Sequence, residues 1–590
     1  MVSSPSDDPP VYDPPAYDSP AAAPAHDSPA APPPAPPAKP AVGHRGTIVA
    51  GCLAVCLAQI GLVLPAAING VIQRSLETSG AELTWISDAF LVPAAVLALT
   101  FGVVGDLYGR KKLLVGGALL AAVGYLVSAT SDSPAQLITG QALSGIGAAA
   151  LFPASLAVII AGTPTPAARA RGLASWTTAL SMGALIAPLL SGAVVEHASF
   201  HWAFAATGVL AVVTAAAAWR LTAESSAPEG RSLDWPGQIT IALALLALLY
   251  GIIQGPADGW GSVTVVGSFV VAAVMLGAFV AAESRGASPM LRLELFRNPA
   301  FSASAAMAVI GMFGFLGGAY DLSIRLGVIQ HQSPLRVAVS FLIIQAVTPL
   351  IWPLLVRLLQ QVGPGPMLVA GFLSLAVGQL WLRAVPVHET GIPVLLGPLL
   401  LNGVGFGLVV AAITAAAVNA VPLHLTGMAA ATTSLVRDLG QTLGPAIVGA
   451  VALATATHQL TGSLQDAALT PAEHGTATAV LDAGGPLALH TADLGPLSAK
   501  IAPLTERALA DGYGDVLLLT AAACLTAAVI AAVSLGVRPR GTAPARKNQT
   551  DRMDQTDRRE QTDRTETDQA NQTDQTDQTD QTDQTEGSRS

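Results

Sequence analysis

The chain has 590 residues, of which 52% are hydrophobic and 12% are charged, and its mean hydropathy is +0.54. Soluble globular proteins carry about 25% charged residues, so this composition excludes an ordinary soluble domain and predicts that most of the chain lies in lipid. The net charge of −10 identifies no partner, because much of it comes from the C-terminal tail.

The two ends of the chain differ in composition from the rest. Residues 1–43 are rich in Pro and Ala and show no cleavable signal peptide, and residues 539–590 form a polar repeat of Gln, Thr and Asp. Neither segment has the apolar residues needed to bury a core, so both are predicted to be disordered tails.

Fourteen apolar runs between the tails are long enough to span a bilayer, at about 20 residues each. They centre near residues 57, 93, 121, 148, 184, 210, 245, 272, 312, 346, 375, 405, 441 and 525. An even number of spans places both tails on one side of the membrane. Because Lys and Arg are concentrated in the loops on that side, the tails are predicted to be cytoplasmic. The segment 457–512 is then an extracellular loop.

An internal repeat indicates how these spans are organised. "GLASWTT" at 172–178 matches "GMAAATT" at 427–433, and "GALIAPLLSG" at 183–192 matches "GQTLGPAIVG" at 440–449. Parallel repeats of this kind are a secondary-transporter design. We expect an all-α integral membrane protein with two pseudo-symmetric six-helix bundles, at 44–221 and 298–538, and two transmembrane helices inserted at 222–297. The repeated motif supplies the candidate residues Gly183, Pro188, Gly192, Gly440, Gly444, Pro445 and Gly449.

The stretch "FGVVGDLYGRKKLLV" at 101–115 concentrates charge between two apolar runs. Gly109 permits a tight turn, and Asp106 can accept charge-assisted hydrogen bonds from basic residues at a helix end. Such a cluster could hold the cytoplasmic ends of the two halves together in one conformation and release them in another. A simple positive-inside anchor would explain the basic residues but not Asp106. We therefore predict a cytoplasmic gate loop formed by Gly102, Asp106, Gly109, Arg110 and Lys111.

This stretch resembles the Gly-x-x-x-Asp-x-x-Gly-Arg-Lys loop of the major facilitator superfamily. With Trp85 and Asp88 before it and the motif at 183–192 after it, the chain resembles the fourteen-helix drug:proton antiporter branch, which includes quaternary-ammonium efflux pumps. The resemblance implies proton-driven efflux of drugs and a seal against leak at the Gly/Pro motifs. Two departures weaken it, because Gln141 stands where relatives usually carry Arg and the first span contains no acid.

Five charged residues in the spans are candidates for coupling a proton to a substrate, since ionisable side chains in a bilayer are costly and usually functional. Asp88 could exchange a proton and attract a cationic substrate, or it could be a hydrated residue near the outer end of its span. Asp321 and Arg325 are spaced i,i+4 and form either a structural ion pair or part of a gate. Arg437 and Asp438 are adjacent, and Arg437 could replace the Arg that the fourth span lacks.

The sequence therefore predicts a monomeric plasma-membrane transporter that exports hydrophobic or cationic small molecules in exchange for protons by alternating access. Two alternatives stay open: a proton-coupled transporter of one endogenous metabolite, and a transporter-like membrane sensor that binds its ligand without moving it. No Walker A string and no metal-ligand cluster occurs, which argues against an ATP-driven pump or a metalloenzyme. We expect no catalytic residue, metal, cofactor or nucleic-acid partner, and the partners are the substrate, protons and the lipid bilayer.

Overall fold

The structure, a computed structural model, describes residues 44–163, 165–227, 233–286, 291–422, 425–492 and 494–535. The two predicted disordered tails, at 1–43 and 539–590, lie outside these residues.

The described residues form α-helices joined by short connections. The helices are α1 (His44–Leu76), α2 (Gly80–Tyr108), α3 (Arg110–Ala129), α4 (Pro134–Ala161), α5 (Pro166–His197), α6 (His201–Leu221), α7 (Trp235–Asp258), α8 (Val263–Arg285), α9 (Pro299–Ile324), α10 (Pro334–Gln361), α11 (Pro364–Ala384), α12 (Ile392–Asn419), α13 (Thr426–Asp466), α14 (Pro471–Thr491) and α15 (Ser498–Ser534). A 3₁₀ turn η1 (Leu293–Arg297) precedes α9, a π-helical turn η2 (Arg325–Ile329) extends it, and a second 3₁₀ turn η4 (Gly495–Leu497) precedes α15.

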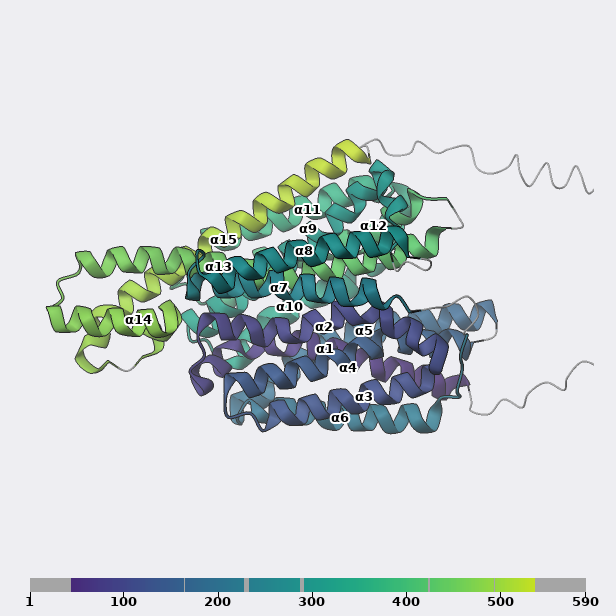
Figure 1. Cartoon of the computed structure of the whole chain (residues 1–590), viewed down its shortest axis with the longest axis horizontal. Helices are drawn as coiled ribbons and strands as arrows, with labels where there is room; N and C mark the ends of the chain where they lie inside the picture. The colour runs from purple at the N-terminus through teal and green to yellow at the C-terminus, as the bar shows by residue number, and fades with distance from the viewer. Residues whose placement is uncertain are drawn as a thin grey trace, which may run out of the picture. The chain divides into compact units, whose positions relative to one another are not determined.

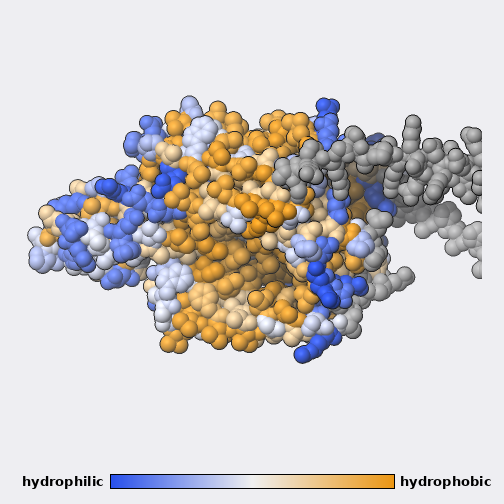
Figure 2. Space-filling view, turned by 90° about the horizontal axis from the view of Figure 1, so that it is seen from above, coloured by the Kyte–Doolittle hydropathy of each residue, from blue (hydrophilic) through white to orange (hydrophobic). Residues whose placement is uncertain are grey.

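Fourteen of the described helices are long and apolar enough to cross a membrane, and α14 is not among them. Figure 2 shows the corresponding belt of hydrophobic surface between hydrophilic ends. The predicted all-α membrane fold with fourteen spans is confirmed. Local sequence sets several helix starts: the Ser79 side chain and Glu82 form a reciprocal capping box at α2, and Ser133 caps α4 directly before a proline.

The helices run roughly parallel and antiparallel to one another in the bundle (Figure 1). α1 to α6 pack together, and so do α9 to α13 with α15; α7 packs against α8 and also contacts α2 and α13. We refer to the first six as the N-terminal helices and to α9–α13 with α15 as the C-terminal helices. The end of the bundle where α1 begins and α15 finishes is called the tail end, and the end that carries α14 is called the insertion end (Figure 1).

Two large apolar cores lie between the helices: the first centres on the N-terminal helices and also includes residues of α9, α13 and α15, and the second is formed mainly by the C-terminal helices. The first cluster includes Phe90, Tyr125 and Phe204, each at most 1% exposed, and the second includes Phe372 and Leu517, also at most 1% exposed. Because lipid is as apolar as these side chains, close packing and buried polar contacts, rather than exclusion of water, stabilise the association of the helices.

The segment 457–512, expected as a loop, is helical in its described residues. α13 continues to Asp466, α14 follows, and α15 begins at Ser498. Leu460, Leu481 and Ile501 of these three helices meet in a small separate core. The segment is therefore a folded insertion at the end of the bundle.

Candidate functional site

Asp88 lies on α2, about two helical turns from the insertion end, and it is fully buried, at 0% exposure. Neither carboxyl oxygen has a hydrogen-bond partner in the described part of the chain. The hydrated alternative for Asp88 therefore does not describe this structure. An ionised carboxylate without a partner is costly in such a place, whereas a protonated carboxyl is much less so, so the site is suited to holding a proton.

Several other buried polar side chains lie near the insertion end of the bundle. Thr84 of α2 is one helical turn before Asp88, and its Oγ1 lies 2.9 Å from the phenol oxygen of Tyr320 on α9. The Tyr513 hydroxyl of α15 is buried without a hydrogen-bond partner among the described residues, as are both side-chain polar atoms of Asn69 on α1. The carboxyl of Asp88 thus belongs to a polar layer to which both groups of helices contribute.

Asp321 and Arg325 are both buried, at 1% and 5% exposure, but they do not form the hydrogen-bonded ion pair that their i,i+4 spacing allows. The Arg325 guanidinium instead donates to the main-chain oxygens of Leu382, at 2.8 Å, and Pro386, at 3.2 Å, where α11 ends. A positive charge at the C-terminal end of a helix is favourable, because the last carbonyl groups have no helical partner. Neither oxygen of Asp321 accepts a hydrogen bond from a described residue, so this carboxyl resembles Asp88.

Arg437 and Asp438 form a weak contact with each other, 3.7 Å between Nε and Oδ1, and their side chains are about one third exposed, at 32% and 28%. Asp438 also accepts a hydrogen bond from Gln441 at 2.8 Å. Gln141 is fully buried about two turns into α4 from the insertion end, whereas Arg437 lies about three turns into α13 from the tail end. Arg437 and Gln141 therefore lie toward opposite ends of the bundle, and Arg437 does not replace the Arg that relatives usually carry at the position of Gln141.

The predicted gate loop joins α2 and α3 at the tail end. Arg110 donates to Asp106 from Nε, at 3.0 Å, and from Nη2, at 2.8 Å. Gly109 has a φ of +117°, a conformation that L side chains rarely adopt, so it allows the sharp turn between the helices. Gly102 makes only an ordinary contact with α4, and a Cβ there would lie 3.8 Å from its neighbour.

The described partners of this loop lie in the last turn of α6 and in the segment that follows it. The amide of Arg110 donates to the Ser225 carbonyl at 2.9 Å, and the amide of Lys111 donates to Glu224 at 3.1 Å. The Lys111 ammonium also lies over the Trp219 ring, 5.3 Å from its centre. The described contacts therefore hold the loop to the segment next to its own group of helices.

The glycines of the repeated motif lie where helices approach closely. A Cβ on Gly183 of α5 would lie 2.6 Å from a carbonyl oxygen of α1, and a Cβ on Gly444 of α13 would lie 2.8 Å from an amide nitrogen of α9. A Cβ on Gly449 would lie 2.6 Å from Thr84 Oγ1. Gly192 and Gly440 contact α10 and α9 as closely, and Pro188 and Pro445 lie inside α5 and α13. The motifs therefore allow tight helix packing, which small residues provide in membranes.

Hydrogen bonds between the N-terminal and C-terminal helices gather at the insertion end. Arg74 of α1 donates to the Gly327 carbonyl of η2 at 3.0 Å, Ser323 donates to a carbonyl of α1, and Glu196 accepts from the Leu335 amide at 3.2 Å. Gly70 of α1 packs against the backbone of Gly327 as well. With the Thr84–Tyr320 contact, these interactions close the bundle at this end.

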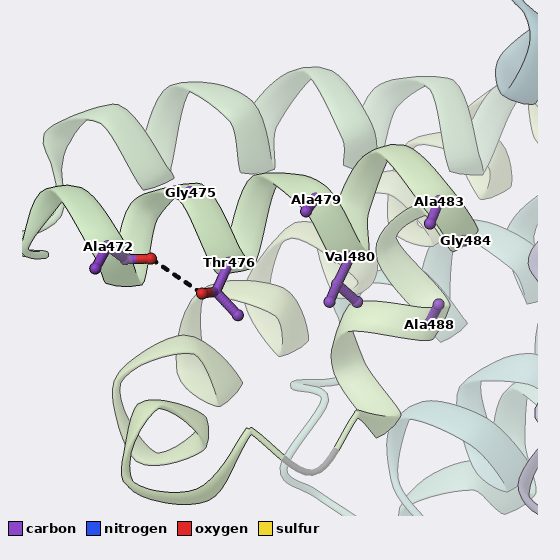
Figure 3. Close-up of a pocket in the computed structure, with 8 residues that line it drawn as sticks. All are labelled: Ala472, Gly475, Thr476, Ala479, Val480, Ala483, Gly484 and Ala488. Atoms are coloured by element: carbon purple, nitrogen blue, oxygen red, sulfur yellow. Dashed lines mark hydrogen bonds between the residues drawn. The ribbon is translucent and has the colours of Figure 1, made fainter.

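A groove outside the bundle core lies on α14 (Figure 3). It has a volume of about 680 Å³ and is lined by small apolar residues and one hydroxyl, that of Thr476, which donates to the Ala472 carbonyl at 3.0 Å. No ionisable side chain lines it, and α14 is not a membrane span, so it forms no part of the polar layer.

Sequence reasoning did not single out Thr84, Tyr320, Tyr513 and Asn69. The sequence offers one indication of their role: they are polar or phenolic residues inside apolar runs, and Tyr320 directly precedes Asp321. Single Thr and Tyr residues are common in such runs, however, and only the rotation of each helix in the bundle shows which of them meet.

Comparison with known proteins agrees with this architecture. The chain matches the family model "Major Facilitator Superfamily" over residues 49–445. It is 30% identical over 418 residues to the multidrug resistance protein Stp of Mycobacterium tuberculosis, covering 71% of this chain and 78% of that protein. It is 25% identical over 514 residues to a tetracenomycin C resistance and export protein of Streptomyces glaucescens, covering 86% of this chain and 95% of that protein.

Solved structures show the same fold at low identity. A bacterial homolog of the human lysosomal transporter Spinster, in an inward-facing and unoccupied conformation, matches with a TM-score of 0.56 at 15% identity, over 86% of this chain and all of that one. An auto-inhibited peptide transporter of the POT family also matches with a TM-score of 0.56 at 15% identity, over 83% of this chain and 96% of that one. With fourteen helices in its described part that are long and apolar enough to cross a membrane, and with the family model matched over most of its length, the chain is a multi-pass membrane transporter that belongs to the Major Facilitator Superfamily.

Proposed function

We propose that this transporter exports hydrophobic or cationic small molecules in exchange for protons by alternating access. The observation that carries the proposal is Asp88, a fully buried carboxyl without a described hydrogen-bond partner in the layer where the two groups of helices meet. The names of its relatives, among them multidrug resistance and antibiotic export proteins, support the choice of substrate class.

Competition for one carboxyl explains how a proton and a substrate are exchanged. Protonated Asp88 has no net charge and does not attract a cation, whereas ionised Asp88 does. A cation that binds therefore favours loss of the proton, and a proton that binds favours loss of the cation. Asp321 is a second buried carboxyl, neither oxygen of which has a hydrogen-bond partner among the described residues.

Alternating access requires that the contacts at the insertion end break while the tail end closes. The Arg74–Gly327 and Thr84–Tyr320 hydrogen bonds belong to the closed insertion end. The gate loop is bound to the segment at 222–227 in this conformation. In the opposite conformation we expect its Asp106–Arg110 pair to contact the C-terminal helices and to hold the tail end closed.

The orientation follows from the charges at the tail end. Arg110, Lys111 and Lys112 begin α3 there, and by the positive-inside rule they support our proposal that the tail end, with both chain termini, faces the cytoplasm. α14 is then on the outer side of the plasma membrane. We propose that the unit of transport is the monomer, in which the two groups of helices provide both sides of the pathway.

Substrate-induced proton release tests the proposal. Purified protein is reconstituted in liposomes, and lipophilic cations are screened under an imposed pH gradient with Asp88→Asn and the exposed loop variant Asp132→Asn as a matched control. We expect cations to release protons from wild type and from the control but not from Asp88→Asn, with a loss of at least about tenfold. Binding of cations without movement of cations or protons would favour a sensor. Full coupling in Asp88→Asn would exclude Asp88 as the coupling residue.

A further inference from the structure

Two carboxyl groups lie close together at the tail end, where α7 begins and α8 ends. Asp234 is the N-cap of α7, and its Oδ1 accepts a hydrogen bond from the Gly237 amide at 2.9 Å. Glu283, in the last turn of α8, is only 4% exposed, and its Oε2 accepts from the Leu291 amide at 2.9 Å. Each carboxyl therefore has one oxygen bonded to the main chain and one oxygen left over.

The two remaining oxygens point to the same place. A Cβ on Gly237 would lie within 2.7 Å of both Asp234 Oδ2 and Glu283 Oε1, so only a glycine leaves room for them. Both oxygens are buried, and neither accepts a hydrogen bond from an N–H or O–H group of the described residues. A buried acceptor without a donor is costly, so this pair of oxygens requires a ligand that binds to both.

The smallest ligand that satisfies both oxygens is one proton. The two side chains lie within hydrogen-bonding range of each other, but two ionised carboxylates have no hydrogen to donate. Two buried negative charges side by side would also repel each other. A carboxylic acid that donates to a neighbouring carboxylate removes both problems, because it halves the charge and forms a strong charge-assisted hydrogen bond.

We infer that Asp234 and Glu283 form a proton-binding site that holds one shared proton and fastens α7 to α8 at the tail end. Through the Leu291 amide, the same carboxyl pair also holds the chain that leads into η1 and α9. α8 packs mainly against α7, so this site is separate from the polar layer that contains Asp88. The inference goes beyond the proposed antiport and does not depend on it.

A proton fits this site better than a metal ion does. The site offers two oxygens, one from each carboxyl, whereas Ca²⁺ takes about six to eight oxygen ligands and Mg²⁺ requires a nearly octahedral set. The described part of the chain contains no group of three or more His, Cys, Asp or Glu side chains that could hold a metal ion.

Loss of the shared proton should loosen the start of α7 as the pH rises. The docked pair holds a proton that two separated, hydrated carboxyls do not hold near neutral pH, so the docked state binds more protons than the undocked state. The stability of docking therefore falls with increasing pH.

Other ionisable side chains occur on the elements packed around the pair, but no described basic side chain donates to its two inward-facing oxygens. They are Tyr250 and Asp258 of α7, Arg285 of α8, Arg292, Glu294 and Arg297 of η1 and its N-cap, Glu82, Asp88, Asp106 and Tyr108 of α2, and Arg437, Asp438, His458 and Asp466 of α13.

Hydrogen–deuterium exchange of the purified full-length protein tests the site without substrate. Exchange is followed in 235–242 of α7 and in 291–297, and it is corrected for the intrinsic effect of pH. In wild type we expect exchange in 235–242 to rise roughly tenfold between about pH 6 and about pH 8, as the pair loses its proton. A wild-type rate that does not rise would contradict the inference.

Amide substitutions separate a shared proton from simple packing. Glu283→Gln and Asp234→Asn each place a permanent N–H donor in the pair, so the hydrogen bond no longer needs a proton and exchange should stay slow at both pH values. Asn is as good an N-cap as Asp, so Asp234→Asn keeps the cap of α7. Glu294→Gln, at an exposed glutamate of η1, is the matched control and should keep the wild-type rise.

Several results would overturn the inference. A rise that persists in both amide variants, or that disappears in Glu294→Gln, would assign the pH dependence to another group. Fast exchange at both pH values in both amide variants would mean that the two side chains serve packing alone. Mg²⁺ or Ca²⁺ added to wild type at about pH 8 should leave exchange unchanged. If either ion restores slow exchange in wild type but not in Glu283→Gln, the site holds a divalent cation instead of a proton.

Discussion

Gly449 shows how one missing side chain determines where three helices meet. Replacing it by Ala places a methyl group 2.6 Å from Thr84 Oγ1, inside the normal contact distance, so α2 or α9 must move. Overpacking of this kind destabilises by about 1–3 kcal/mol. We expect Gly449→Ala to lower the thermal unfolding midpoint of the purified protein and to increase the open fraction at the insertion end.

Gly462 of the same helix provides the control for this substitution. A Cβ at Gly462 would have no neighbour within 4 Å, so Gly462→Ala should not destabilise the protein and gains up to about 1 kcal/mol from its better helix propensity. Equal effects of the two substitutions would mean that helix propensity, rather than the close approach of α2 and α9, explains the result.

At the scale of elements, α14 is held to the bundle by contacts with both groups of helices. The ring of His490 stacks on that of His331, which follows η2, with ring centres 5.1 Å apart and planes 2° from parallel. Gln73 of α1 donates to Thr491 at 3.1 Å. Burial, and then the nearby His331, lower the pKa of His490 from 6.5 to about 4. Burial and the charge of Arg74 lower the pKa of His331, which Glu506 partly opposes.

These pKa values predict that acid weakens the docking of α14. The docked state favours neutral His490, so above about pH 6.5 docking is complete, and between about pH 6.5 and 4 only the undocked state gains a proton. Hydrogen–deuterium exchange in 471–491, corrected for the intrinsic effect of pH, should therefore increase across this window. His490→Gln should remove the increase, and His474→Gln on the same helix should retain it. An increase that persists in His490→Gln would assign the sensitivity to another group.

The elements differ in how far the sequence predicts them. Long apolar runs predict spans because a bilayer requires about 20 apolar residues, and all fourteen correspond to described helices. α14 was missed because its Ala, Gly and Thr composition has no apolar run and resembles a loop. The burial of Asp88 and the contact between Thr84 and Tyr320 depend on the rotation of α2 and α9 about their axes. Local sequence does not determine this rotation, because small residues surround both helices.

At the scale of the whole molecule, the described hydrogen bonds between the N-terminal and C-terminal helices lie at the insertion end. α7 is bonded to α2 away from that end, because Gln238 donates to the Val96 carbonyl at 2.8 Å. Removing one contact at the closed end should therefore shift the balance between two whole-molecule conformations, in addition to any local effect. The size of the shift is limited by the free energy of that contact.

Arg74 offers the clearest test of this balance. Arg74→Ala removes the 3.0 Å hydrogen bond to Gly327 across the two groups of helices. Because Arg74 is exposed, we expect a loss of about 1 kcal/mol, which raises the ratio of open to closed conformations roughly fivefold. The ratio is measured as the distance distribution between spin labels at Asp132→Cys and Glu389→Cys, exposed loop positions at this end in the two groups of helices, in a background whose three native cysteines are replaced by Ala. Arg383→Ala is the matched control, since its ion pair with Asp515, at 3.4 Å, lies at the same end but within the C-terminal helices. An unchanged ratio in Arg74→Ala, or an equal change in both variants, would show that the contacts between the two groups of helices at this end do not set the conformational balance.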